Sequence, residues 1–327
     1  MTSNPRSASP VDFDIYGPYA PKSPAGKLLA RPGPAFPNRI TADGSSGYRA
    51  EPGRYHLYAA KPCPFCHRVT ITRALKGLED VVSISTLDPM RDGRGWAFRE
   101  GDGHTLDAVN GFAFLSEAYE ATDPGFEGHY SAPVLWDKVT HRIASNDYRN
   151  MSIDIGTAFD EWARQDIDLY PELLRAEIDE LNEFLFERVH NGPYRCGFAP
   201  TQQDYEREVR SLFTALDELE ERLATRRYLF GDRITDSDVR LWVTLARFDA
   251  VYATHFKANL RRIVDYPNLW GYARDLYQRK EFSETTDFDQ IKRHYFLTHT
   301  WINPSKIVPL GPELDWTQPS DRDRLAG

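Results

Sequence analysis

The chain has 327 residues, of which 41% are hydrophobic and 13% aromatic, so it is long enough to build two packed domains. Its 40 basic and 49 acidic residues give a net charge of −9 without a basic stripe, which argues against nucleic acid as a partner. No apolar run reaches the length of a membrane span and no secretory signal is visible, so we expect a soluble, cytoplasmic protein without a membrane partner.

Residues 1–50 are rich in proline and glycine and show little periodicity. Prolines that exclude a regular helix recur at Pro18, Pro21, Pro24, Pro32, Pro34 and Pro37. We therefore expect an extended arm. The aromatic residues expected to pin it to the body are Phe13, Tyr16, Tyr19 and Phe36.

Residues 51–155 alternate between strand and helix patterns. The expected strands are 55–58, 81–85, 132–137 and 142–144. The expected helices begin at Pro64 and run to residue 76, and then cover 112–120. A hairpin that follows a βαβ unit is the outline of a thioredoxin-like domain.

Cys63 stands at the turn between the first strand and the first helix, in the sequence Lys61-Pro62-Cys63-Pro64-Phe65-Cys66. Backbone N–H groups and the helix dipole favour an anion at such a helix start. A thiol placed there is commonly more acidic than a free cysteine, so its thiolate is available at neutral pH. The sequence therefore predicts thiol chemistry at Cys63.

Three cysteines are too few for a disulfide scaffold in a chain of this length. Cys63 and Cys66 have the spacing of half a zinc site, but Cys196 is the one other cysteine and no second Cys-x-x-Cys pair follows. We expect no metal, and we interpret Cys196 as a small buried residue.

Residues 156–327 read as all-helical, with a C-terminal tail. Apolar residues recur at helix spacing over 169–189, 209–223 and 239–245, and another helix is expected from Tyr266 to Gln278. Thr235 is expected to cap the third of these helices, with Asp238 reaching back to it.

Several short sequence segments in the second half of the chain resemble the Xi-class glutathione transferases, the glutathionyl-hydroquinone reductases. They include Asn191-Gly192-Pro193-Tyr194, Arg227-Tyr228-Leu229-Phe230-Gly231-Asp232, Ala246-Arg247-Phe248-Asp249, His255-Phe256-Lys257 and Ile291-Lys292-Arg293-His294-Tyr295-Phe296. The resemblance covers roughly residues 39–312. It implies the glutathione transferase fold, in which an α/β thioredoxin-like N-terminal domain binds the thiol and an all-α C-terminal domain binds the quinol.

The resemblance also implies a reaction. Cys63 would attack the sulfur of a glutathionyl-hydroquinone, release hydroquinone and form a mixed disulfide, which a second thiol would resolve. The family uses two aromatic hydroxyl groups near the quinol, and these match Tyr194 and Tyr295. A homodimer and glutathione, or another low-molecular-weight thiol, as co-substrate are implied in the same way.

The residues that would hold the thiol match in part. Pro133 takes the place of the family's cis-proline, Ala132 supplies the backbone beside it, and Trp96 matches a tryptophan that packs on the thiol. The glutamyl site reads Asn146-Asp147-Tyr148 where the family has Asn-Glu-Ser, and His129 replaces an arginine. Because these departures fall on the face that reads the glutamyl end, another thiol such as mycothiol is a hypothesis.

The cysteine motif departs as well, because the family usually has Cys-Pro-Trp-Ala. Cys66 is either a buried residue in place of alanine or a second thiol that resolves the mixed disulfide. Two alternatives therefore stay open, a glutaredoxin-like dithiol thioltransferase that uses Cys63 and Cys66, and a non-catalytic binding protein on the same fold. A conjugating transferase fits less well, since a cysteine in that place favours a covalent mixed disulfide.

Overall fold

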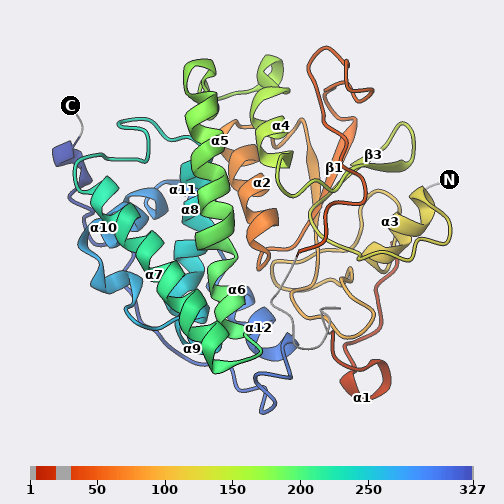
Figure 1. The fold of residues 1–327 in the computed structure, drawn as a ribbon. Coiled ribbons are helices and arrows are strands. Elements are labelled where there is room, and N and C mark those ends of the chain that lie inside the picture. Colours follow the sequence, from red (N-terminus) through yellow and green to blue (C-terminus); the bar gives the residue numbers. More distant parts are fainter. Residues whose placement is uncertain (1–4, 20–30, 326–327) are drawn as a thin grey trace.

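The computed structural model describes residues 5–19 and 31–325. A small mixed sheet with its helices lies beside a larger helical part (Figure 1). Helix α2 (Pro64–Leu75) stands between them, packed against α4 (Met151–Thr157) and α8 (Asp236–Arg247).

The sheet has the order β2-β1-β3-β4, with β1 and β2 parallel and the other pairs antiparallel. This is the predicted βαβ unit followed by a hairpin, and the thioredoxin-like fold class is confirmed. The strands are β1 (Tyr55–Ala59), β2 (Ser83–Thr86), β3 (Val134–Asp137) and β4 (Arg142–Ser145), and α3 (Leu115–Thr122) packs on β4.

Several element boundaries differ from the prediction by one to three residues, and two of these shifts have a clear local cause. Strand β2 begins at Ser83 because the amides of Val81 and Val82 both donate to the carbonyl of Leu78, in the turn that closes α2. Helix α3 begins at Leu115 because the Phe114 backbone is extended and bridges Ala97.

The helical part is built around α7 and α8, and both were predicted. Its α-helices are α5 (Arg175–Phe184), α6 (Gly192–Gly197), α7 (Gln202–Leu223), α8, α9 (Ala253–His255), α10 (Pro267–Tyr277), α11 (Lys280–Ser283) and α12 (Phe288–Thr298). Short turns of 3-10 helix are η1 (Asp160–Trp162), η2 (Glu172–Leu174), η5 (Ile263–Asp265) and η6 (Arg322–Leu325), and π-helical turns are η3 (Leu185–His190) and η4 (Phe248–Tyr252).

The helix expected over 169–189 is shorter than the periodicity suggested. Pro171 disfavours helical backbone before it, so α5 starts only after the 3-10 turn η2 and then continues as the π-helical turn η3. The predicted capping of α8 is confirmed, since Asp238 accepts a hydrogen bond of 2.8 Å from the amide of Thr235.

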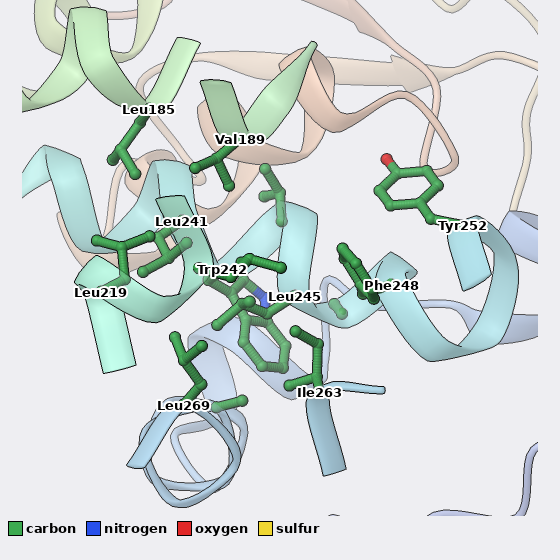
Figure 2. Close-up of a cluster of buried hydrophobic side chains, with 14 of the residues drawn as sticks. Leu185, Val189, Leu219, Leu241, Trp242, Leu245, Phe248, Tyr252, Ile263 and Leu269 are labelled. Atoms are coloured by element: carbon green, nitrogen blue, oxygen red, sulfur yellow. The ribbon is translucent and has the colours of Figure 1, made fainter. Parts of the chain in front are cut away.

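The core of the helical part surrounds Trp242 of α8, which is fully buried (Figure 2). Apolar side chains from α7, α8, α10, η3 and η4 pack against each other in this cluster. Tyr252 lies at its edge, apart from Trp242 (Figure 2). The cluster therefore presents a polar group at the border of a hydrophobic core.

Residues 5–19 and 31–50 of the arm are extended apart from one short helix that the prediction missed, and the predicted positions Pro21 and Pro24 lie outside the described residues. Helix α1 (Phe13–Tyr16) is capped by the Asp12 carboxylate and ends at Gly17, whose φ of 69° favours glycine. The aromatic residues of the described arm do contact the body. Phe36 packs on Tyr119, and Tyr19 stacks on Arg91.

Candidate active site

Cys63 is the residue that caps the start of α2, and Pro64 occupies the first helical position. The cysteine is partly exposed, and its Sγ lies 3.6 Å from the carbonyl oxygen of Ala132. The Ala132–Pro133 peptide bond is cis. The structure thus brings Cys63, Ala132 and Pro133 together, as the sequence suggested.

The electrostatics of the cysteine pair separate the two thiols. Burial raises the pKa of Cys63, but hydrogen bonds from the Cys66 thiol and the backbone N–H groups of Cys66 and Phe65, together with the charge of Arg247, bring it down to about 6. Burial and the neighbouring Cys63 raise the pKa of Cys66 well above its ordinary value. Cys63 is therefore the thiolate at neutral pH, and Cys66 is a protonated donor to it.

Arg247, the last residue of α8, is a functional candidate that the sequence analysis did not single out. Its guanidinium is fully buried and donates to the carbonyl oxygens of Pro62 at 3.0 Å and Lys61 at 2.9 Å. It also lies 3.1 Å from Nδ1 of His67, whose pKa burial and Arg247 lower well below its usual range. Arg247 therefore holds the backbone that precedes Cys63, and its positive charge favours the thiolate form of Cys63.

The two predicted tyrosines meet in the helical part. Their hydroxyl oxygens are 2.5 Å apart, and Tyr252 lies 3.3 Å from the hydroxyl of Tyr295. Burial and the neighbouring tyrosines raise the pKa values of Tyr295 and Tyr252 well above their ordinary range. These groups stay protonated, so they are hydrogen-bond donors at neutral pH.

Trp96 is buried and contacts a histidine and an arginine. His294 stacks on its ring with centroids 5.2 Å apart, and the guanidinium of Arg91 lies 4.1 Å from the ring centroid. His294 is next to Tyr295 in α12, so Trp96 connects the loop after β2 to the tyrosine pair.

His129 faces the arm. Both ring nitrogens of His129 lie 3.3 Å from the hydroxyl oxygen of Tyr19. Its contact with a thiol carboxylate stays a prediction.

Asn146 joins the arm to the sheet. Its side chain accepts from the Phe36 amide at 2.7 Å and donates to the Tyr119 hydroxyl at 3.0 Å and to Ser131 at 3.2 Å. The amide group thus has protein partners for both donors, and its expected contact with the thiol stays a prediction.

Asp147 and Tyr148 also have protein partners. Asp147 accepts from the backbone amide of Arg149 at 3.0 Å and from the side chain of Asn150 at 2.7 Å, just before α4. The Tyr148 hydroxyl donates to the carbonyl of Pro32, and its ring lies against Phe65 with centroids 4.9 Å apart.

Arg31 is the second functional candidate that the sequence analysis missed. It comes from the arm, and its guanidinium carbon lies 4.8 Å from the ring centroid of Phe65 and 4.6 Å from that of Tyr194. Its Nε donates to Asn191 at 2.6 Å. Arg31 therefore joins the cysteine helix to the tyrosine pair, and a guanidinium between two aromatic rings is a common cation–π arrangement.

No cluster of three potential metal ligands exists among residues 5–19 and 31–325. In the same part of the chain, no helix combines the length and apolarity that crossing a membrane requires.

Comparisons with known proteins place the chain in a family. Residues 202–275 match the family model for the glutathione S-transferase C-terminal domain. The chain is 43% identical over 312 residues to glutathionyl-hydroquinone reductase YqjG of Escherichia coli, covering 93% of this chain and 95% of the relative. It is 46% identical over 267 residues to glutathionyl-hydroquinone reductase PcpF of Sphingobium chlorophenolicum, covering 82% of this chain and 85% of that relative.

Solved structures agree. The glutathione-bound structure of YqjG matches with a TM-score of 0.86 over 88% of this chain and 96% of that one, at 43% identity. The Xi glutathione S-transferase of Phanerochaete chrysosporium matches with a TM-score of 0.85 over 89% and 99%, at 41% identity. The chain therefore belongs to the Xi-class glutathione transferases, the family of the glutathionyl-hydroquinone reductases.

Proposed function

We propose that this protein is a thiol-dependent reductase that releases hydroquinone from S-glutathionyl-hydroquinone, or from the same conjugate of another low-molecular-weight thiol. The observation that carries the proposal is the position of Cys63 at the start of α2 beside the cis Ala132–Pro133 bond, with Arg31 between Phe65 of the same helix and Tyr194 of the tyrosine pair. The two relatives named as glutathionyl-hydroquinone reductases support it.

The reaction has two steps. The Cys63 thiolate attacks the thioether sulfur, a disulfide forms between Cys63 and the thiol, and the bond between sulfur and the ring carbon breaks. The ring carbon takes up a proton, and the electron pair of that bond passes to the ring, so hydroquinone leaves. A second thiol then attacks the disulfide, regenerates Cys63 and leaves as the oxidised thiol.

The tyrosines have the chemistry that the first step needs. When the ring carbon that bears the sulfur has taken up its proton, the adjacent ring oxygen is a carbonyl oxygen, and the electron pair of the breaking bond between sulfur and carbon places negative charge on that oxygen. A protonated hydroxyl group that donates to such an oxygen stabilises the transition state more than the ground state. We assign this role to Tyr194 and Tyr295, with Cys63 as the nucleophile.

The residues of the thiol side support a co-substrate other than glutathione. His129 faces Tyr19, the Asp147 carboxylate accepts from the Arg149 amide just before α4, and the Tyr148 hydroxyl donates to Pro32. Each of these side chains is occupied by the protein where the resemblance implies contacts with the glutamyl end. Glutathione remains the co-substrate that the bound YqjG structure supports, and mycothiol is the proposed alternative.

The test compares two conjugates. Purified reduced protein is given glutathionyl-hydroquinone or mycothiyl-hydroquinone with the matching thiol, and hydroquinone release is followed by chromatography. Release with either conjugate, lost in Cys63→Ser, supports the reductase, and the faster conjugate identifies the thiol. The absence of release with both would contradict the proposal.

A dithiol thioltransferase is the second candidate, because the Cys66 thiol hydrogen-bonds Cys63 and is placed to resolve a mixed disulfide. We further propose that residues 51–155 bind the thiol and residues 156–327 the quinol, and that the enzyme is a cytoplasmic homodimer. Sedimentation analysis tests the dimer, and a monomer at working concentration would contradict it.

A further inference from the structure

The arm places a positive charge beside the proposed quinol site. Arg31 lies between the rings of Phe65 and Tyr194, and Arg68 lies on the Phe65 ring as well, with its guanidinium carbon 4.8 Å from the centroid. Arg68 is buried, and its Nη1 has no hydrogen-bond partner among the described residues. The guanidinium groups of Arg31 and Arg68 therefore both contact the ring of Phe65, which directly follows Cys63 and Pro64 in the chain.

Arg31 also lines a cavity of about 270 Å³. The cavity is slightly smaller than the roughly 300–1,000 Å³ of ordinary ligand pockets, so it fits part of a ligand rather than a whole conjugate. Its polar lining consists of Arg31, Tyr148, Arg149, Glu187, Asn191 and Arg195.

The three arginines of this lining differ in whether they are paired with a carboxylate. Arg195 is paired with Glu187 at 2.6 Å, and Arg149 is paired with Glu183 at 3.2 Å. Among the described residues, Arg31 has no carboxylate within ion-pair distance, and its single hydrogen bond uses Nε. Both terminal nitrogens of Arg31 are thus left to donate to a ligand, in the fork geometry that matches a carboxylate.

The segment that carries Arg31 is held firmly. The Tyr148 hydroxyl donates to Pro32, and Phe36 exchanges hydrogen bonds with Asn146 at 2.7 and 3.0 Å through its amide and carbonyl groups. Arg39 pairs with Asp154 at 2.6 Å. Since these contacts hold residues 32–39 in place before a ligand binds, Arg31 is positioned at little further cost in entropy.

Arg31 both lines this cavity and lies on the Tyr194 ring. We infer that it is a specificity-determining residue whose guanidinium binds a carboxylate of the conjugate. The inference rests on the proposed function and names its substrate class. A carboxylate exists on the thiol half when the thiol is glutathione, and on the quinol half when the hydroquinone ring carries one. The contact of Arg31 with Tyr194 favours the quinol half, so the preferred substrate is a carboxylated hydroquinone conjugate.

The test measures binding without turnover. Calorimetry with wild-type protein and Arg31→Gln uses three probes, which are S-methylglutathione, the carboxylated hydroquinone gentisate, and hydroquinone itself. Loss of one charged hydrogen-bonded pair weakens binding by about tenfold to a hundredfold. We expect Arg31→Gln to weaken the binding of gentisate by that factor and to leave the affinity for hydroquinone unchanged. Arg31→Lys should recover part of the lost gentisate affinity.

A matched control is Arg175→Gln, because Arg175 also lies on a tyrosine ring, that of Tyr170, but is exposed and outside the cavity. It should change none of the three affinities. If Arg31→Gln weakens the binding of S-methylglutathione alone, the assignment of the carboxylate to the quinol half is contradicted. The inference is overturned if neither carboxylate probe binds wild-type protein, if Arg31→Gln weakens neither, or if it weakens hydroquinone equally. Since no reaction is measured, failure of the proposed reductase activity would be seen separately.

Discussion

The guanidinium of Arg247 hydrogen-bonds the carbonyl oxygen of Pro62, which lies 185 positions earlier in the chain. A second bond reaches the carbonyl of Lys61. The helical part therefore holds the backbone that leads into the reactive cysteine, and the same charge lowers the pKa of Cys63. Reactivity at Cys63 depends on the docking of the two parts of the molecule as well as on the start of α2.

Removal of the Arg247 charge should make Cys63 less acidic. In wild-type protein, alkylation of Cys63 by iodoacetamide should rise with pH and reach half its maximum near pH 6, the pKa of the thiol. Because a nearby cation favours the thiolate, Arg247→Gln should move this midpoint upward, by about one unit. Arg247→Lys keeps the charge and should move it less. An unchanged midpoint in folded Arg247→Gln would contradict the assigned role.

Substitution of Cys66 separates the two proposed activities. If the mixed disulfide is resolved by a second small thiol, Cys66→Ser should keep most of the hydroquinone release. If Cys66 resolves it, most turnover should be lost. We expect retention, since Cys66 is fully buried and its pKa is raised. Cys196→Ser, at a buried cysteine of the helical core, is the control for a lost thiol that lies elsewhere.

The tyrosine pair should act on the chemical step. Tyr194→Phe and Tyr295→Phe each remove one donor from the quinol site, and loss of such a donor commonly lowers kcat by about a hundredfold to a thousandfold. KM should change less, because the donor stabilises the transition state. Tyr252→Phe removes a hydroxyl that contacts Tyr295 and should have a smaller effect. Equal kcat values in wild type and in both pair variants would refute the role.

Asn146 is predicted to act on stability rather than on chemistry. Its side chain is buried and joins Phe36 of the arm to Tyr119 and Ser131. Asn146→Ala leaves buried partners unsatisfied, which destabilises the fold by about 1–3 kcal/mol. Denaturant unfolding measures this loss. A variant of unchanged stability with much weaker thiol binding would instead support a direct contact with the thiol.

The fold was predictable because local patterns carry it. Alternating strand and helix signals around Cys63 and the helical periodicity after Asp160 gave the right order of elements, and errors arose where a turn or Pro171 interrupted a pattern. Cys63 was found from its place before Pro64, a local feature.

The rest of the site depends on contacts between distant parts of the chain. Arg31 and Asn191 are 160 positions apart, and Arg247 and Pro62 are 185 apart. An arginine is ordinarily a surface residue. Nothing in the neighbouring sequence marks Arg247 as buried or Arg31 as the partner of two aromatic rings. The occupied state of Asn146 was hidden for the same reason, because its partner Phe36 lies 110 positions away.

The central claim is that Cys63 takes the thiol as hydroquinone leaves, and a single-turnover experiment tests it most directly. Reduced Cys66→Ser protein is mixed with glutathionyl-hydroquinone in the absence of free thiol, quenched with acid and analysed by intact mass and peptide mapping. We predict one hydroquinone released per protein, with one glutathionyl group attached at Cys63. Continued release with an unmodified Cys63, or equal release by Cys63→Ser, would contradict the account.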